Sequence, residues 1–242
     1  MNSQEPAIAL QAATKRFGGV VAVDSVTLEI RPGERVGLIG PNGAGKTTVV
    51  KLMTGEERVS SGRVGLLGRD VTRKPVHARA RRGLGRSFQI TELCFELSVR
   101  DNLLLAANRG SRYEGWRDTA DRFNLLPLVD KPVREIGYGE QRRLEMAMAL
   151  VQEPRVLLFD EPAAGLDAED RTAVQDAIGT LSRDLALLII DHDVDLIVSV
   201  SDRIVCLANG KVIADGTPDE VIADEQVQRS YLGIAEGEGA AA

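Results

Sequence analysis

Short apolar runs alternate with helical patterns along much of this chain. Residues 156–159 and 186–190 are continuous apolar runs, which is typical of strands buried on both faces of a parallel sheet. Residues 7–39 alternate short β-rich runs with turns, whereas 91–152 carry mostly helical patterns with polar joints. The pattern predicts an α/β fold with a parallel-sheet core and a helical insertion between its two halves.

The same pattern places the individual elements. We expect strands at 35–39, 63–67, 87–89, 156–159 and 186–190, and helices near 77–82, 99–107, 140–151, 168–185 and 194–200. Asn209-Gly210 marks the turn of a final pair. Thr217, Pro218 and Glu220 combine an N-cap, a proline at the first helical position and an acidic third residue, so a last helix is expected to begin there.

Composition narrows the class of protein. Of 242 residues, 43% are hydrophobic and 27% charged, which is ordinary for a globular protein, and the net charge of −6 gives no indication of nucleic-acid binding. The basic cluster Arg79, Arg81, Arg82 and Arg86 is expected to be a solvated helix face.

Two further features concern the cellular setting. Cys94 and Cys206 are far apart and lack metal-ligand spacing; Cys206 lies in an apolar run and is expected to be buried, and both cysteines indicate a reducing compartment. The first residues do not resemble a signal peptide, and the longest apolar run is too short to span a bilayer. We therefore expect a cytoplasmic protein whose membrane role, if any, comes through a partner.

The most informative segment is a glycine-rich loop between the strand at 35–39 and a predicted helix. It fits the phosphate-binding template G-x-x-x-x-G-K-[ST] and consists of Gly40, Pro41, Asn42, Gly43, Ala44, Gly45, Lys46, Thr47 and Thr48. Backbone amides and the helix N-terminus bind phosphate oxygens in such a loop, while Lys46 neutralises the phosphates and Thr47 ligates Mg²⁺. An ordinary glycine-rich turn is the alternative, but the lysine, the threonine and both flanks favour a nucleotide triphosphate site.

Polar side chains also follow two buried strands. Asp160 and Glu161 end the strand at 156–159, where Asp160 could hold Mg²⁺ and Glu161 could act as general base toward water. His192 follows the strand at 186–190 and could donate a hydrogen bond to the γ-phosphate or to the attacking water. The alternatives are a solvated acidic turn and a capping histidine; His77, in a basic stretch, is assigned no function.

Three weaker signals complete the candidate site. Gln89 could reach Mg²⁺ at a change from strand to helical pattern, although such glutamines are usually only polar joints. Phe17 could stack on adenine or could equally be a core residue. Gly137 and Gly139 open a predicted helix whose N-terminus could face an anion held by another copy of the chain.

These motifs occur in the order and rough spacing of the ATP-binding-cassette (ABC) ATPases, which the chain resembles from about residue 6 to 232. The resemblance implies a P-loop NTPase core (6–90 and 154–222) with an antiparallel β subdomain, a helical subdomain (91–153) and a C-terminal helix and tail (223–242). It also implies ATP and Mg²⁺ as ligands, with ATP hydrolysis as the reaction.

The resemblance also implies a role for each site residue. Phe17 would stack on adenine, and Thr47, Gln89 and Asp160 would bind Mg²⁺. Glu161, Gln89 and His192 would take part in catalysis. Residues Gly137 through Glu140 would form the signature of the family. The usual signature serine is replaced by Gly137, which removes a hydroxyl contact to the γ-phosphate across the dimer. We expect Gly137→Ser to raise dimer-dependent ATPase activity.

Within the family, stretches such as YGEQRRLEMAMAL and DEPAAGLD most resemble the ATPases of branched-chain amino acid importers. HARARRG and DEQVQRSYLG also resemble the lipopolysaccharide-export ATPase, so export stays an alternative, as does a soluble ABC ATPase acting on ribosomes or DNA ends. A non-catalytic regulatory nucleotide binder is disfavoured by Glu161 and His192, and a GTPase by the lack of an N-K-x-D motif.

The expected partners follow from the importer assignment. They are a second nucleotide-binding subunit, identical or paralogous, transmembrane permease subunits contacting the region around Leu93 to Leu97, and, indirectly, a solute-binding protein; no nucleic acid is expected. The chain would then lie on the inner face of the cell membrane.

Overall fold

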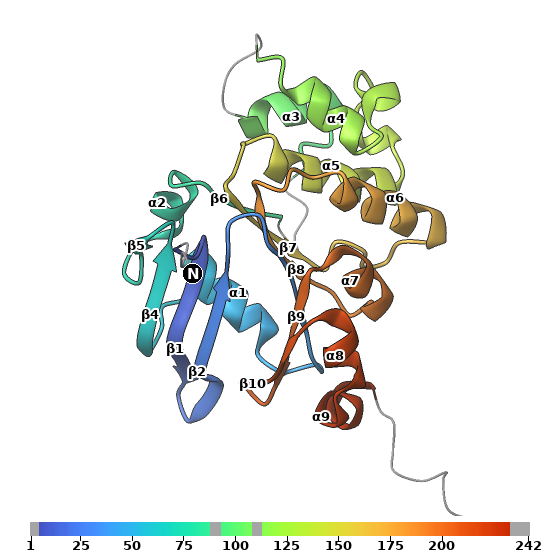
Figure 1. Cartoon of the computed structure of the whole chain (residues 1–242). Helices are drawn as coiled ribbons and strands as arrows, with labels where there is room; N and C mark the ends of the chain where they lie inside the picture. Colours follow the sequence, from blue (N-terminus) through green and yellow to red (C-terminus); the bar gives the residue numbers. More distant parts are fainter. Residues whose placement is uncertain (1–4, 88–92, 108–112, 233–242) are drawn as a thin grey trace, which may run out of the picture.

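A computed structural model of the chain describes residues 5–87, 93–107 and 113–232. Its larger sheet has the strand order β10-β9-β3-β8-β7-β6, in which β10 is antiparallel to β9 and the other five strands run parallel (Figure 1). These strands are β3 (Arg35–Ile39), β6 (Leu84–Arg86), β7 (Val156–Asp160), β8 (Ala186–Ile190), β9 (Arg203–Ala208) and β10 (Lys211–Gly216). The predicted parallel core is confirmed.

A second sheet is antiparallel and has the order β2-β1-β4-β5. It consists of β1 (Ile8–Phe17), β2 (Val20–Ile30), β4 (Ser61–Leu66) and β5 (Arg69–Asp70). Ile8 of β1 pairs with Ile30 on one side and Leu66 on the other, and irregularities in β1 shift the register farther along. This sheet has the pairing expected for the antiparallel β subdomain.

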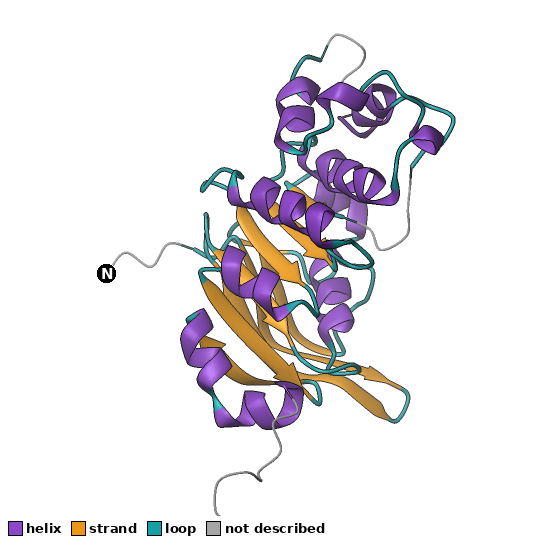
Figure 2. Ribbon diagram, turned by 90° about the vertical axis from the view of Figure 1, so that its right-hand side faces the viewer, coloured by secondary structure: helices purple, strands orange, loops and turns teal. Residues whose placement is uncertain are grey.

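The helices lie on both sides of the strands (Figure 2). They are α1 (Lys46–Thr54), α2 (Val76–Ala80), α3 (Val99–Ala107), α4 (Trp116–Arg122), α5 (Tyr138–Leu150), α6 (Ala168–Gly179), α7 (Val194–Val200), α8 (Pro218–Ala223) and α9 (Glu225–Val227), with the short helical turns η1 (Leu126–Leu128), η2 (Val133–Glu135) and η3 (Gln228–Leu232). Helices α3, α4 and α5 come from the segment between β6 and β7 and form the upper part of the molecule in Figure 1. This is the predicted helical insertion.

Strand β8 shows why the central strands read as continuous apolar runs. Leu188 and Ile190 belong to the hydrophobic cluster that contains α1 and the antiparallel sheet, whereas Leu187 and Ile189 belong to the cluster that contains α6 and α7. Because successive side chains point to opposite faces, a strand covered on both faces must be apolar at every position. Packing on both faces therefore holds β8 in place, and with it the residues that follow its carboxyl end.

Three local features can be compared with the sequence. Helix α8 begins as predicted, with Thr217 as N-cap and Glu220 completing the capping box. The helix expected to run to residue 185 instead ends at Gly179, because the chain turns through Thr180 and Ser182 before β8. Strand β6 ends at Arg86, one residue before the strand expected at 87–89, of which residues 88 and 89 lie outside the described residues.

The prediction of a solvated arginine face is wrong for Arg79. Its side chain is 1% exposed, and its Nη1 donates to the carbonyl oxygens of Leu52 (2.7 Å) and Met53 (2.8 Å) in the last turn of α1. Burial lowers the pKa of Arg79 to about 10. Arg79 therefore stabilises the end of the helix that follows the glycine-rich loop.

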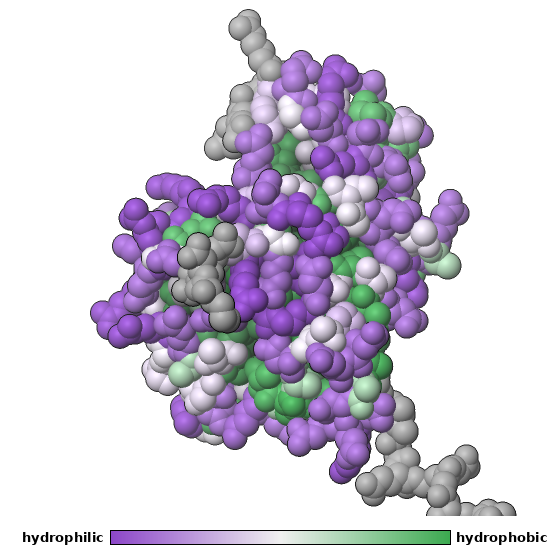
Figure 3. Space-filling model, viewed as in Figure 1, coloured by the Kyte–Doolittle hydropathy of each residue, from purple (hydrophilic) through white to green (hydrophobic). Residues whose placement is uncertain are grey.

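The hydropathy of the surface and of the helices bears on whether the described part of the chain could cross a membrane. On the face drawn in Figure 3, hydrophilic residues dominate and hydrophobic residues occur in scattered groups. Among the described helices, none combines the length and the apolar character that crossing a bilayer requires.

Candidate functional site

The candidate polar segments follow neighbouring strands of the parallel sheet. The glycine-rich loop follows β3, Asp191 and His192 follow β8, and Glu161 follows β7. Strands β3, β8 and β7 are adjacent and parallel, so their carboxyl ends lie at one edge. The fold thus brings the glycine-rich loop together with two polar segments that lie more than 100 residues further along the chain.

The loop requires glycine at two positions. Gly40 has φ 146° and Gly45 has φ 106°, backbone conformations that residues with a side chain rarely adopt. A Cβ at Gly40 would collide with the carbonyl oxygen of Leu207, and one at Gly45 with that of Ala22. The loop is therefore held against β9 and β2 by close backbone approach.

Lys46 lies in the loop at the first residue of α1. Its Nζ donates to the carbonyl oxygens of Gly40 (2.5 Å) and Pro41 (3.1 Å). Burial lowers the pKa of Lys46, while the charges of Glu161 and Asp160 oppose that shift. The amine is thus partly buried, and an incoming anionic group would gain a charge-assisted hydrogen bond there.

The start of α1 is also suited to an anion. Gly45 is its N-cap, so no side chain satisfies the first amide groups of the helix. By contrast, Asp167 caps α6 and Asp193 caps α7. Thr47 is exposed on the first turn of α1. Unpaired amides, a lysine and a hydroxyl together form a cradle that fits a nucleotide phosphate.

Asp160 and Glu161 differ sharply in environment. Asp160 is 1% exposed, and its Oδ2 accepts a hydrogen bond of 2.9 Å from Nη2 of Arg86. Glu161 is partly exposed and has φ 51°, an uncommon conformation for a residue other than glycine. Its N–H donates to the Ile190 carbonyl oxygen (2.6 Å), and its own carbonyl oxygen accepts from Nη2 of Arg142 (2.6 Å).

His192 is supported by its neighbour Asp191. Asp191 is fully buried and accepts hydrogen bonds from the backbone N–H groups of Ala163 (3.0 Å) and Asp193 (3.0 Å). Its Oδ1 lies 3.4 Å from Nδ1 of His192, whose side chain is mostly exposed. The histidine is therefore presented at the edge by a rigid, negatively charged support.

The remaining candidates come from other elements. Phe17 ends β1 on the antiparallel sheet; it is 46% exposed, and the Lys15 amine lies 4.7 Å from its ring centre. Gly137 is the N-cap of α5, and Gly139 in its first turn lies against the Asp170 carboxylate, which a Cβ at that position would displace. Gln89 lies outside the described residues.

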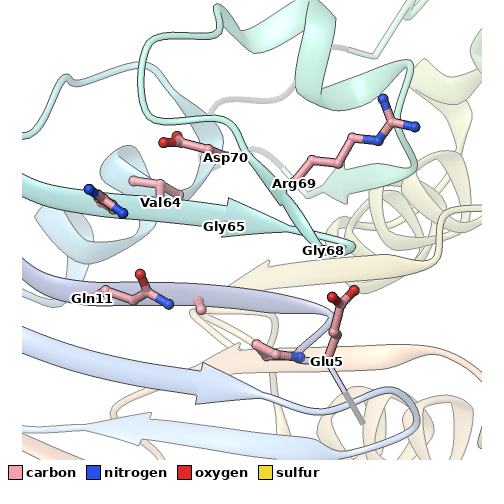
Figure 4. Close-up of a pocket in the computed structure, with 10 residues that line it drawn as sticks. Glu5, Gln11, Val64, Gly65, Gly68, Arg69 and Asp70 are labelled. Carbon is pink, nitrogen blue, oxygen red and sulfur yellow. The ribbon is translucent and has the colours of Figure 1, made fainter.

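Two further observations concern a hollow elsewhere on the molecule and possible clusters of metal ligands. A hollow of about 250 Å³ lies beside β1, β4 and β5, but the ten residues drawn around it in Figure 4 include none of the predicted site residues. No cluster of three or more metal-binding side chains occurs in the part of the chain that the structure describes.

Sequence reasoning missed two arginines. The expectation of a solvated side chain is wrong for Arg86, whose side chain is 9% exposed and pairs with Asp160 and with Glu56. Arg142 carries no signal in the sequence, because only the fold brings it to the carbonyl groups of Asp160 and Glu161. A buried partner distant in sequence leaves no local signal.

Comparison with known proteins gives consistent results. The family model described as "ABC transporter" matches residues 23–164, and that described as "Branched-chain amino acid ATP-binding cassette transporter" matches 211–237. The high-affinity branched-chain amino acid transport ATP-binding proteins LivG of Salmonella typhimurium and BraF of Pseudomonas aeruginosa are 37% and 35% identical, over 96% and 95% of this chain and 99% of each relative.

An export protein and solved structures are also similar. The lipopolysaccharide export system ATP-binding protein LptB of Acidithiobacillus ferridurans is 37% identical over 92% of this chain and 95% of its own. The ADP conformation of MJ1267, an ATP-binding cassette of an ABC transporter, has a TM-score of 0.85 at 25% identity, covering 95% of this chain and 99% of its own. A nucleotide-free cassette has a TM-score of 0.83 at 26% identity, covering 96% of this chain and all of its own.

Proposed function

The chain belongs to the ABC transporter family of ATP-binding cassettes, and from this premise we propose that it is the ATP-hydrolysing subunit of an importer of branched-chain amino acids. The observation that carries the proposal is the meeting of the glycine-rich loop, Asp160–Glu161 and Asp191–His192 at the edge of β3, β7 and β8. Each motif has a common structural alternative by itself, but their meeting at one edge favours nucleotide chemistry.

ATP binding is assigned to the loop and to α1. The amides at the start of α1 and the Lys46 amine would bind the phosphates, replacing the carbonyl contacts that Lys46 now makes. Thr47 and Asp160 supply the oxygen ligands that Mg²⁺ prefers, and the ion would neutralise phosphate charge. Phe17, exposed at the end of β1, would stack on the adenine ring.

Hydrolysis is assigned to Glu161 with His192. Glu161 would accept a proton from the attacking water, and His192 would donate a hydrogen bond to the phosphate or orient that water. The positive φ of Glu161 supports this role, since such strained conformations cluster at functional sites. Gln89 keeps its proposed contact with Mg²⁺ or the water.

A second copy or a paralogue would complete each site. Helix α5 begins at Gly137 with its N-terminus exposed, and a head-to-tail dimer would place that N-terminus against the nucleotide of the partner. Closure on ATP and reopening after hydrolysis would then drive permease subunits at the inner face of the membrane, acting with a solute-binding protein. Phe95 (42% exposed) and Leu97 (39%) support a permease contact on the helical part.

The transported solute is inferred from relatives. The match of residues 211–237 to the branched-chain family model favours amino acid import, because that segment lies beyond the general cassette match. Export of a lipopolysaccharide-type molecule is the second candidate, favoured by the identity to LptB, which equals that to LivG.

The test is reconstitution of the chain with the permease and solute-binding protein encoded by its neighbouring genes. Proteoliposomes should accumulate radiolabelled leucine only when Mg²⁺ and ATP are present, and Lys46→Ala should abolish uptake. ATP hydrolysis without leucine uptake, together with ATP-dependent extraction of lipopolysaccharide, would instead support the exporter.

A further inference from the structure

Side chains from the first two turns of α5 contact the loop that follows β7. Tyr138 Oη donates to the carbonyl oxygen of Ala164 at 3.2 Å. Arg142 Nη2 donates to the carbonyl oxygens of Asp160 (3.1 Å) and Glu161 (2.6 Å). The helix assigned to the partner's nucleotide is thus hydrogen-bonded to the loop that carries the proposed base of its own chain.

Arg142 is buried in a way that directs its guanidinium to these carbonyls. The residue is 7% exposed, and its charge is balanced by Glu145 on the same helix, with Nη1 and Oε2 2.7 Å apart. Nη1 thus pairs with a carboxylate of α5, whereas Nη2 of the same planar group donates to the loop. Two carbonyl groups from consecutive residues converge on one nitrogen there.

Arg142 contacts the backbone at Glu161, a residue with an uncommon conformation. Glu161 has φ 51°, a conformation that persists only when surrounding contacts hold it. The N–H of Glu161 is bonded to Ile190 within the sheet, whereas Arg142 supplies a contact from the helical part of the molecule. A shift of α5 would therefore move the Glu161 backbone.

Tyr138 contacts the same loop a few residues further on, at Ala164. Its side chain is 57% exposed, so burial does not explain why it lies along the loop. The ring lies against Gly165, which has φ 73° and where a Cβ would come within 3.3 Å of Cε1. Helix α5 and the loop are consequently joined at two points, one at Glu161 itself and one at Ala164 and Gly165.

We propose that Arg142 is a positioning residue for Glu161, and that Tyr138 and Arg142 together couple the placement of α5 to the placement of that carboxylate. The coupling rests on the proposed function, since it is the nucleotide of a second subunit that would position α5. Each subunit would then hydrolyse its own ATP only after α5 is seated on the partner's ATP.

The first test concerns positioning alone and uses the full chain. Arg142→Gln should lower kcat about 10- to 100-fold, as a misplaced catalytic group does, while KM for ATP and ADP affinity change less than about threefold. Arg142→Lys should recover part of kcat. Arg122→Gln is the matched control, because Arg122 Nη1 also donates to a backbone carbonyl, that of Thr180 at 2.6 Å, away from the sheet edge.

A hydrogen-exchange measurement on the nucleotide-free chain keeps this test independent of dimerisation. Amides 160–166 should exchange faster in Arg142→Gln and in Tyr138→Phe than in the wild type. Tyr113→Phe, which removes a hydroxyl bond to Glu153, and Arg122→Gln should leave them unchanged. Unchanged exchange in Arg142→Gln, or a kcat within about twofold of wild type, would overturn the positioning role.

The second test concerns coupling. Wild-type ATPase activity should be cooperative in ATP, and Tyr138→Phe should lower the Hill coefficient toward one while ADP affinity stays unchanged. Cooperative wild-type activity with the same Hill coefficient in Tyr138→Phe would overturn the coupling and leave the proposed function intact. Failure of the wild-type chain to bind or hydrolyse ATP would instead refute the proposed function.

Discussion

Arg86 Nη2 lies 2.9 Å from Asp160 Oδ2, and the two side chains are only 9% and 2% exposed. Arg86 also pairs with Glu56, just beyond α1, so one guanidinium links the ends of α1, β6 and β7. The carboxylate assigned to Mg²⁺ is thus paired with a protein cation in this structure. Cation binding at Asp160 would have to weaken or replace this pairing.

Substitution of Arg86 tests whether Arg86 and Mg²⁺ compete for Asp160. Arg86→Gln removes the arginine partner of the buried Asp160 carboxylate, so the free energy of unfolding should fall by about 3–5 kcal/mol without nucleotide. Mg²⁺ with ATP should raise the melting temperature of the variant more than that of the wild type, because the ion supplies the missing charge. Thermal unfolding with and without EDTA measures this; equal stabilisation of both proteins would contradict it.

The replacement of the signature serine can be tested by restoring it. Gly137 has φ −68°, and a Cβ there would meet only Glu140 Oε2 at 3.6 Å, so a side chain fits. A serine hydroxyl facing the partner's γ-phosphate should contribute about 1.5–3 kcal/mol. Gly137→Ser should therefore raise ATPase turnover and lower the ATP concentration needed for dimerisation. Gly137→Ala is the control; equal or lower turnover in the serine variant would contradict the expectation.

Phe17 should affect adenine binding and leave phosphate binding alone. Phe17→Leu should weaken ATP binding by about 0.5–1.5 kcal/mol through loss of an aromatic stack, whereas Phe17→Trp should retain it. Isothermal titration with ATP and with tripolyphosphate separates the two effects, since tripolyphosphate has no ring. A parallel loss of both affinities would show that Phe17 acts on the fold.

Cys206 gives a prediction at high pH. It is fully buried on β9, and burial raises the pKa of its thiol to about 11 from an ordinary value of 9.0. Between these values the unfolded thiol releases a proton that the folded one keeps, so the free energy of unfolding should fall as pH rises. The free energy of unfolding of Cys206→Ala should fall less steeply than that of the wild type in denaturant titrations from pH 9 to 11; equal slopes would contradict the prediction.

Local sequence information was sufficient for some of the fold. The central strand β8 could be recognised because both its faces are covered, which requires an apolar residue at every position. The start of α8 could be recognised because Thr217, Pro218 and Glu220 act on amides within one turn. In both cases the determinant is contained in the segment itself.

Other features depend on partners far along the chain. Arg79 reads as a solvated basic residue, yet it is buried against carbonyls 26 and 27 residues away. Arg86 bonds to Asp160, 74 residues on, and Arg142 reaches Glu161, 19 residues on. A buried arginine and a surface arginine look alike in a sequence, so the supports of the candidate site became visible only in the fold.

If one chain carries half of each ATP site, the oligomeric state of Glu161→Gln should depend on ATP and Mg²⁺. The variant keeps the phosphate loop but lacks the proposed base, so it should bind ATP without hydrolysing it. Light scattering after size exclusion should show a dimer that ADP does not support and that Lys46→Ala prevents. A Glu161→Gln chain that stays monomeric and hydrolyses ATP at the wild-type rate would contradict the account.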